Sequence, residues 1–136
     1  MEKILIGFDF SMNKPAATIY YKGNYYHYFW PLNISKKQIE QYNEAGVFVK
    51  NRELSSINVK DIESSQLVLI HTIRSTDLAN LIINDIDSLI SQFNCESYDL
   101  YICSEGLSYG SKGDATLNLA TYKGVLLSKI YEHYGD

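Results

Sequence analysis

The stretch ICSEGLSYGSKGD, residues 102–114, decides the expected fold, because it joins an apolar run ending at Glu105 to a glycine-rich loop and then to a helix. A second apolar run, KILIGFDFS at 3–11, carries Asp9 near its end. A carboxylate at the tip of a buried strand is costly unless it has a partner. Two such strand-end acids, Asp9 and Glu105, are what a divalent-metal site at the edge of a sheet requires.

The first part of the chain predicts three strands. Residues 3–10 are apolar on both faces, which is typical of a central strand covered on two sides. Two aromatic-rich runs, 16–22 and 25–30, predict a tight antiparallel hairpin whose two-residue link is Gly23-Asn24. Pro31 then ends the pairing.

Residues 32–62 are polar and contain five basic side chains. They predict a solvated loop or, as the alternative, a basic loop that contacts substrate. Between 65 and 93 apolar residues recur every three or four positions, which predicts an amphipathic helix. The N-cap signal Ser75-Thr76-Asp77 allows two helical pieces instead of one, and Asn94 ends the helix.

A strand at 98–104 and a helix at 115–134 complete the series, with Asp114 as the N-cap of that helix. Gly124 in this helix predicts a close approach by a neighbouring element. The order of elements predicts an α/β fold with a mixed sheet, an antiparallel N-terminal β-hairpin, and first and fourth strands that run parallel. Parallel neighbours end at the same edge of a sheet, so Asp9 and Glu105 are expected to meet there.

The composition limits the classes of protein to which this chain can belong. A chain of 136 residues, 46% hydrophobic and 21% charged, is ordinary for one soluble globular domain. The net charge of −4 argues against a simple DNA-binding module, and less against a metal nuclease, because bound metal ions offset acidic residues. The two cysteines and three histidines match no metal-ligand spacing.

Carboxylate oxygens are the ligands that Mg²⁺ prefers, and phosphodiester hydrolases use one or two such ions. Asp9 and Glu105 are therefore the candidate catalytic and metal-binding residues, with Mg²⁺ or Mn²⁺ as the ion. The alternatives are a turn cap for Asp9, bonded to the backbone near 11–13, and an ordinary exposed acid for Glu105. Five further aspartates are expected in loops or on solvated faces: Asp61, Asp77, Asp85, Asp87 and Asp99.

The loop GLSYGSKG, residues 106–113, lacks the spacing of a P-loop. Its backbone amides and Lys112 lie next to a predicted helix N-terminus, a place where a DNA phosphate is held. Tyr109 is expected either to stack on a base or to pack over the loop. Ser11 and Ser108 complete the candidate DNA-binding residues. The aromatic residues of the hairpin are expected to pack across strands.

The two ends of the chain together resemble a known family. GFDFSMNKPA at 7–16 and ICSEGLSYGSKGDATLNLATYKGVLLSKIYEH at 102–133 are similar to the RuvC-like Holliday-junction resolvases of the RNase H-like superfamily, particularly those of large phages and viruses. The resemblance covers the middle of the chain only through the order of elements. It implies that Asp9 is the first-strand catalytic aspartate and Glu105 the fourth-strand glutamate, with Tyr109 nearest the family's aromatic DNA contact.

The resemblance also implies a substrate, and this chain differs from the family in one respect. The substrate would be branched or junction DNA, cut by a homodimer. The apolar side of the helix at 78–93 is expected either to pack in the core or to form the dimer contact. The family's fold continues with a strand and a helix that carry further acids, whereas this chain ends at Asp136. We therefore expect residues 1–136 to be a single RNase H-like domain, truncated, with little or no nuclease activity on its own.

Two other functions stay open. One is a non-catalytic RNase H-like domain that serves as an assembly scaffold. The other is a phosphotransferase of the actin and sugar-kinase fold, although Ser11 stands where that branch has glycine. No signal-peptide pattern and no apolar run near ~20 residues is present. The sequence thus predicts no membrane contact and a cytoplasmic protein, in the host cytoplasm if it is phage-encoded.

Overall fold

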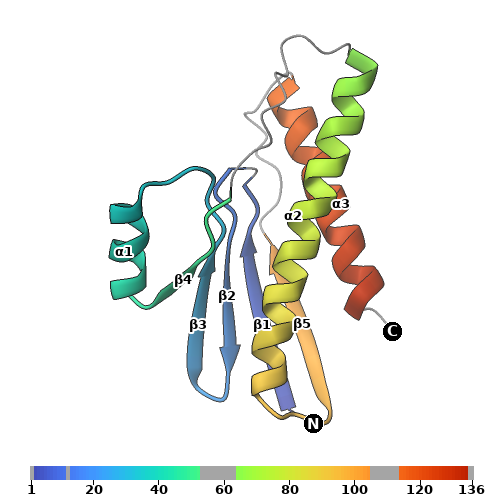
Figure 1. Cartoon of the computed structure of the whole chain (residues 1–136). Coiled ribbons are helices and arrows are strands. Elements are labelled where there is room, and N and C mark those ends of the chain that lie inside the picture. The colour runs from blue at the N-terminus through green and yellow to red at the C-terminus, as the bar shows by residue number, and fades with distance from the viewer. Residues whose placement is uncertain (1, 12, 53–63, 105–113, 135–136) are drawn as a thin grey trace. The chain divides into compact units, whose positions relative to one another are not determined.

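The computed structural model describes residues 2–11, 13–52, 64–104 and 114–134. The chain divides into two compact units, one formed by Met1–Ser55 with Cys95–Gly106 and the other by Ser56–Asn94 with Leu107–Asp136. Over the described residues the fold is α/β, with a five-stranded mixed sheet and three helices. The first unit contains the sheet and a short helix, and the second contains two long helices (Figure 1).

The sheet has the order β4-β3-β2-β1-β5, so β1 lies inside it and β5 forms one edge (Figure 1). β1 pairs antiparallel with β2, and β2 pairs antiparallel with β3. β1 pairs parallel with β5, as the order of elements predicted, and β3 pairs parallel with β4. The strands are β1 (Glu2–Asp9), β2 (Ala16–Tyr21), β3 (Asn24–Phe29), β4 (Val47–Val49) and β5 (Tyr98–Ser104).

The two faces of β1 differ in burial. Ile4, Ile6 and Phe8 are at most 6% exposed, and they form the core face with Ile19 of β2. On the other face Leu5 is 43% exposed, and its neighbours on that face are also exposed. The prediction of a strand covered on both sides is therefore wrong. Glycine and aspartate alternate with leucine on the second face and bring too little apolar area to require a cover.

The hairpin between β2 and β3 turns at Lys22-Gly23, one residue before the predicted Gly23-Asn24, and Tyr21 pairs with Asn24. Both turn residues have positive φ, 48° for Lys22 and 80° for Gly23. This is the pattern of a type I′ turn, whose twist matches that of the flanking strands. The paired backbone fixes the turn, so Asn24 belongs to the strand.

Residues 32–62 are not wholly a loop, so that prediction is wrong for two segments, α1 (Lys36–Glu44) and β4. Ser35 caps α1 in a capping box with Gln38, in which Ser35 Oγ accepts from the Gln38 amide at 3.2 Å. α1 buries no side chain fully. The ring centroids of Phe29 in β3 and Tyr42 in α1 lie 4.9 Å apart, and so do those of Tyr28 in β3 and Phe48 in β4. A local sequence pattern cannot predict such tertiary contacts.

α2 (Ser64–Gln92) is a single helix, so the alternative of two pieces is wrong. The Thr76 hydroxyl donates to the carbonyl of Thr72 at 2.9 Å, a bond made inside a helix rather than at its start. Asn94 ends the helix as predicted, with φ at 53° in the left-handed region.

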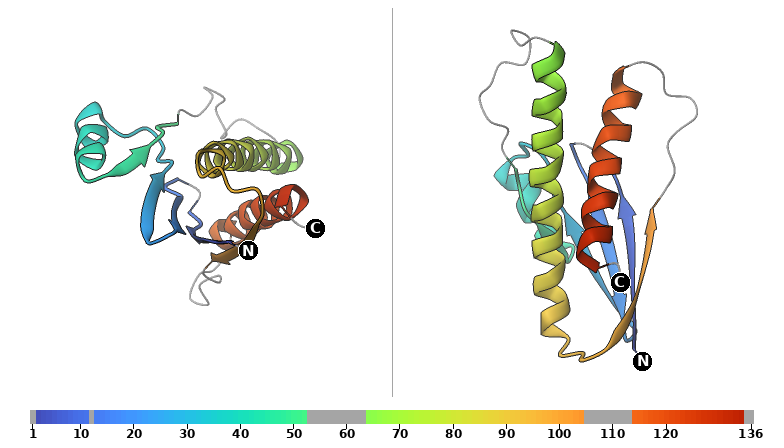
Figure 2. Two further views of the ribbon diagram at one scale, coloured as in Figure 1. Left: turned by 90° about the horizontal axis from the view of Figure 1, so that it is seen from below. Right: turned by 90° about the vertical axis from the view of Figure 1, so that its right-hand side faces the viewer.

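α3 (Asp114–Tyr134) packs beside α2 and runs in the same direction (Figures 1 and 2). Ile82 and Ile86 of α2 and Leu126 and Ile130 of α3 are all at most 4% exposed. Gly124 is exposed, and a Cβ added there would meet nothing within 4 Å, so the predicted close approach is wrong. None of the helices, as far as they are described, is long and apolar enough to cross a membrane.

Two glycine-to-alanine substitutions test the turn and the helix. Gly23→Ala places a Cβ on a residue with φ near 80° and should lower the free energy of unfolding by about 1 kcal/mol. Gly124→Ala, in open space on α3, should raise it by up to about 1 kcal/mol through helix propensity. Urea unfolding of the three proteins measures both effects, and a Gly23→Ala variant as stable as the wild type would contradict the turn assignment.

Candidate functional site

The predicted acid Asp9 is exposed and is the last residue of β1, paired with Ala16 of β2. On its other side β1 runs parallel to β5, and Phe8 is the register partner of Ser104, the last residue of β5. Ser104 directly precedes Glu105 in the sequence. β1 and β5 therefore end at the same edge of the sheet, as predicted for the first and fourth strands. Four candidates lie outside the described residues: Glu105, Ser108, Tyr109 and Lys112.

The turn after β1 is closed by Ser11. Its Oγ accepts a hydrogen bond from the backbone N–H of Lys14 at 3.3 Å. Within the described part of the turn, Ser11 therefore takes the capping role that was the alternative for Asp9. The Ser11 hydroxyl retains its proton for a further acceptor, which is compatible with its predicted contact to DNA.

Arg52 fixes this turn from a distance. Its Nε donates to the carbonyl of Trp30 at 2.9 Å, and its Nη2 donates to the carbonyl of Asn13 at 3.2 Å. Its backbone N–H also donates to the carbonyl of Pro31 at 2.9 Å, within a parallel bridge between Leu32 and Arg52. The antiparallel hairpin pairing ends at Phe29, before Pro31, as predicted. Sequence reasoning placed Arg52 in a polar loop and missed this role, because no local spacing signals a contact 39 residues away.

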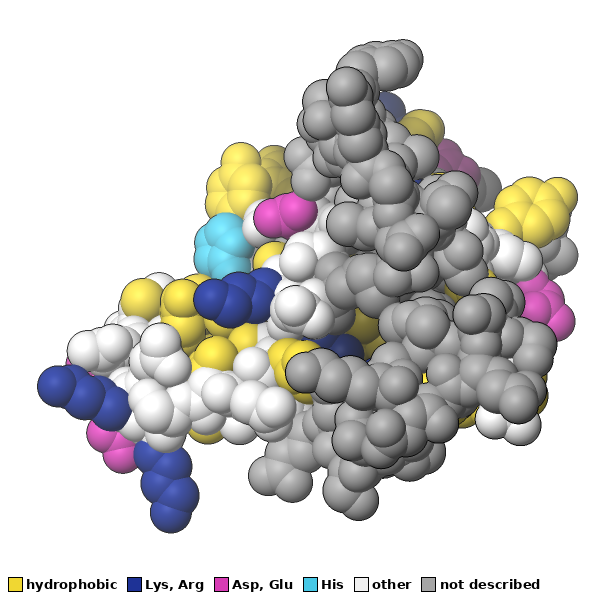
Figure 3. Space-filling view, turned by 90° about the horizontal axis from the view of Figure 1, so that it is seen from above, with side chains coloured by type: hydrophobic (Ala, Val, Ile, Leu, Met, Phe, Trp, Pro, Cys, Tyr) yellow, Lys and Arg dark blue, Asp and Glu magenta, His cyan; other side chains and the backbone are white. Residues whose placement is uncertain are grey.

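The donor chemistry at this edge suits a hard cation. Asp9 supplies an exposed carboxylate, the type of ligand that Mg²⁺ or Mn²⁺ takes. Within the ranges that the structure describes, no three His, Cys, Asp or Glu side chains come together as a metal-binding group. Figure 3 looks onto the side at which β1 and β5 end, and its described basic side chains project mainly where α1 lies. Lys36 and Lys37 on α1 are exposed.

A second polar cluster lies at the opposite end of the sheet, around Glu2. The Glu2 carboxylate accepts from the Tyr21 hydroxyl, from Lys22 Nζ at 2.7 Å and from the Cys95 thiol at 2.8 Å. These hydrogen bonds, with Cys95 first, lower the pKa of Glu2 from its usual 4.5 to about 2. The same contact raises the pKa of Cys95. Glu2 thus joins the start of β1 to the hairpin turn and to the segment before β5.

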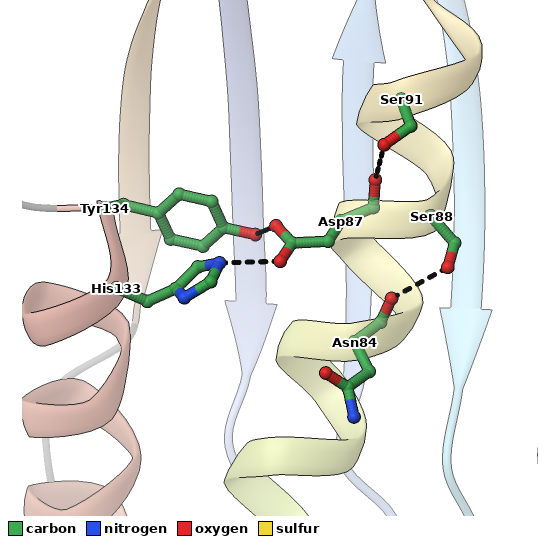
Figure 4. Close-up of polar contacts among 6 residues, drawn as sticks. All are labelled: Asn84, Asp87, Ser88, Ser91, His133 and Tyr134. Atoms are coloured by element: carbon green, nitrogen blue, oxygen red, sulfur yellow. Dashed lines mark hydrogen bonds and ion pairs between the residues drawn. The ribbon is translucent and has the colours of Figure 1, made fainter.

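A third cluster joins α2 to α3 (Figure 4). The Asp87 carboxylate contacts His133 Nε2 at 2.6 Å and accepts from the Tyr134 hydroxyl. Asp87 was predicted to lie on a solvated face. Its side chain is 39% exposed, and it also contacts the end of α3, which the sequence did not predict. An open groove of about 290 Å³ lies beside the cluster and is lined by Asn80, Ile83, Asn84, Lys129, Glu132 and His133.

Comparison with known protein families, with curated proteins and with solved structures found no significant match for this chain. The RNase H-like and RuvC-like assignment therefore stays a prediction from the sequence. The three clusters differ in what they offer chemically. The Glu2 and Asp87 clusters bond their carboxylates internally, whereas Asp9 presents its carboxylate to solvent at the end of a strand.

The lowered pKa of Glu2 predicts a pH dependence. Because the carboxylate is favoured in the folded state, its contribution to stability is complete above about pH 4.5 and is lost as the pH falls toward 2. Wild-type protein should therefore lose melting temperature over that range more steeply than Glu2→Gln. Glu96→Gln, an exposed acid in the same segment as Cys95, is the matched control and should follow the wild type. Identical pH profiles for Glu2→Gln and the wild type would contradict the assignment.

Proposed function

We propose that this chain carries the metal site of a Mg²⁺-dependent, structure-selective DNA endonuclease with an RNase H-like fold of the RuvC type. Asp9 and Glu105 are the proposed metal ligands, and Mn²⁺ is the proposed substitute ion. One observation carries the proposal: β1 and β5 pair in parallel, with Phe8 opposite Ser104. Parallel pairing brings the two strand ends to one edge of the sheet, which is where α/β proteins place their sites.

The exposure pattern of β1 supports Asp9 as a ligand. The carboxylate follows the buried run Ile4, Ile6 and Phe8 and projects from the exposed face. Ser11 closes the turn that follows Asp9, and Arg52 ties that turn to the segment after β3, so two side chains hold the backbone just after Asp9. A ligand on such a supported strand end loses little freedom when it binds an ion.

A bound ion would supply a lowered pKa for the attacking water and stabilisation of the leaving oxygen. The chain's own residues would position the substrate. Ser11 follows Asp9 by two residues, and within the described residues its hydroxyl acts only as an acceptor. Ser11, Ser108, Tyr109 and Lys112 are the proposed contacts to the DNA backbone and to a base. Branched or junction DNA is the proposed substrate, on the resemblance to the resolvases.

Metal titration tests the proposal directly. Mn²⁺ should broaden the backbone amide NMR signals of Phe8 and Ser104 before those of Glu2 and Tyr98, which lie at the other end of the same two strands. Asp9→Asn and Glu105→Gln should each weaken Mn²⁺ binding by more than about tenfold. Asp99→Asn removes an exposed acid from β5 away from the site and should leave binding unchanged.

Equal Mn²⁺ affinity in Asp9→Asn and in the wild type would contradict the metal site. Cleavage of a synthetic four-way junction gives a second readout, expected to be weak for this chain alone and absent in Asp9→Asn. Junction cleavage that survives in Asp9→Asn would contradict the assignment of Asp9. A protein that neither binds Mn²⁺ at this edge nor cuts DNA would favour the scaffold function instead.

A further inference from the structure

An apolar row crosses the exposed face of the sheet. Tyr25 of β3, Tyr20 of β2, Leu5 of β1 and Tyr101 of β5 are direct register partners, one on each of four adjacent strands. Tyr25 is 65% exposed, Tyr101 48% and Leu5 43%. The rings of Tyr20 and Tyr25 contact each other with centroids 5.0 Å apart. A contiguous exposed apolar row of this kind on a sheet marks an interaction surface.

The two rows next to the Leu5–Tyr101 row pair side chains of different charge or size on β1 and β5. Lys3 on β1 is the register partner of Asp99 on β5, and both are exposed. Neither side chain has a hydrogen bond or ion pair within the part of the chain that the structure describes. Gly7 on β1 is the partner of Cys103, and a Cβ built on Gly7 would meet nothing within 4 Å. In each of these two rows the residues on β1 and β5 are therefore complementary, in charge for Lys3 and Asp99 and in size for Gly7 and Cys103.

We propose that this face, centred on β1 and β5, is a contact surface between two copies of this chain. A two-fold axis parallel to the strands and midway between β1 and β5 places β1 of one copy over β5 of the second at the same level. Lys3 then faces Asp99 of the second copy, Leu5 faces Tyr101, and Cys103 enters the space left by Gly7. Each contact occurs twice, as a two-fold interface requires.

The spacing of the two sheets and the area that they bury determine the strength of this contact. Sheets that pack face to face lie about 10 Å apart with interdigitating side chains, a distance that these residues span. The sheets cross at an angle because each is twisted, so the alignment is closest at the central Leu5 and Tyr101. Only β1 and β5 of each copy overlap, so Leu5 and Tyr101 lie in the contact while Tyr20 and Tyr25 stay outside it. The small buried area fits a weak, concentration-dependent dimer rather than an obligate one.

Charge favours a second copy over nucleic acid as the occupant. Exposed tyrosines also stack on bases, but a nucleic-acid surface needs excess positive charge. On this face Lys3 stands against two acids, Asp9 and Asp99, and the whole chain has a net charge of −4. The contact uses neither a metal ion nor DNA, but it covers the face of β1 from which Asp9 projects, so the dimer and a DNA complex at Asp9 compete for the same surface.

Sedimentation velocity under reducing conditions, over a wide range of protein concentration, tests the proposal. Wild type should show a monomer–dimer equilibrium. Lys3→Asp and Asp99→Lys should each weaken the dimer by about tenfold, because like charges then face each other twice. An equimolar mixture of these two variants should regain association, since opposite charges face each other in the mixed dimer. A pair within one copy cannot be restored by mixing, so this result separates the two explanations.

Gly7→Val provides a matched variant that fills the open space without a clash inside one copy. It should melt no lower than the wild type, because valine favours strands, and should fail to dimerise. A wild type that stays monomeric at every concentration, or a mixture that stays monomeric, would overturn the proposal. Binding of a thymidine oligonucleotide that shifts the Tyr101 ring signals would also overturn it, in favour of a nucleic-acid surface.

Discussion

The parallel pairing of β1 with β5 is the constraint on which the rest of the structure depends. It joins strands from the two ends of the sequence, Glu2–Asp9 and Tyr98–Ser104, and fixes which side chains stand next to each other. Because side chains alternate along a strand, a slip of one residue would turn Ile4 and Ile6 to solvent and Leu5 to the core. The buried isoleucines therefore specify the register, and the register sets the position of Asp9 beside the end of β5.

Polar contacts hold the two ends of this strand pair. At one end Glu2 accepts hydrogen bonds from Tyr21, Lys22 and Cys95, and at the other Arg52 donates to the backbone of Asn13 and Trp30. Both clusters join segments far apart in the sequence. Charged donors or acceptors strengthen these bonds relative to neutral ones. The exposed acid Asp9 thus lies between the start of β1, which is bonded through Glu2, and a turn that Arg52 bonds.

The sequence was a good guide to the long elements and a poor one to the short elements. Periodicity located β1, β2, β3, β5 and both long helices within a few residues, because each has an apolar repeat over many positions. α1 was missed because it is short and polar, and β4 was missed because it has only three residues, Val47–Val49. Ring contacts from β3 reach both elements, Phe29 with Tyr42 and Tyr28 with Phe48. Alternation along β1 gave its buried face, but it could not show that Leu5, on the other face, lies open to solvent.

For the candidate site, a strand-end carboxylate is a local signal, so Asp9 was found from the sequence. Arg52 and Glu2 depend on partners brought together only by folding, and no spacing predicts them. Glu105 and the loop candidates lie outside the described residues, so their part in the site stays a prediction.

The most direct test of the account is a set of nuclear Overhauser effects between the backbone protons of β1 and β5. The parallel register predicts contacts that join Leu5 to Tyr101 and Gly7 to Cys103, with Phe8 beside Ser104. Contacts shifted by one residue, or an antiparallel pattern, would move Asp9 away from the end of β5. Either result would contradict both the proposed metal site and the proposed contact between two copies.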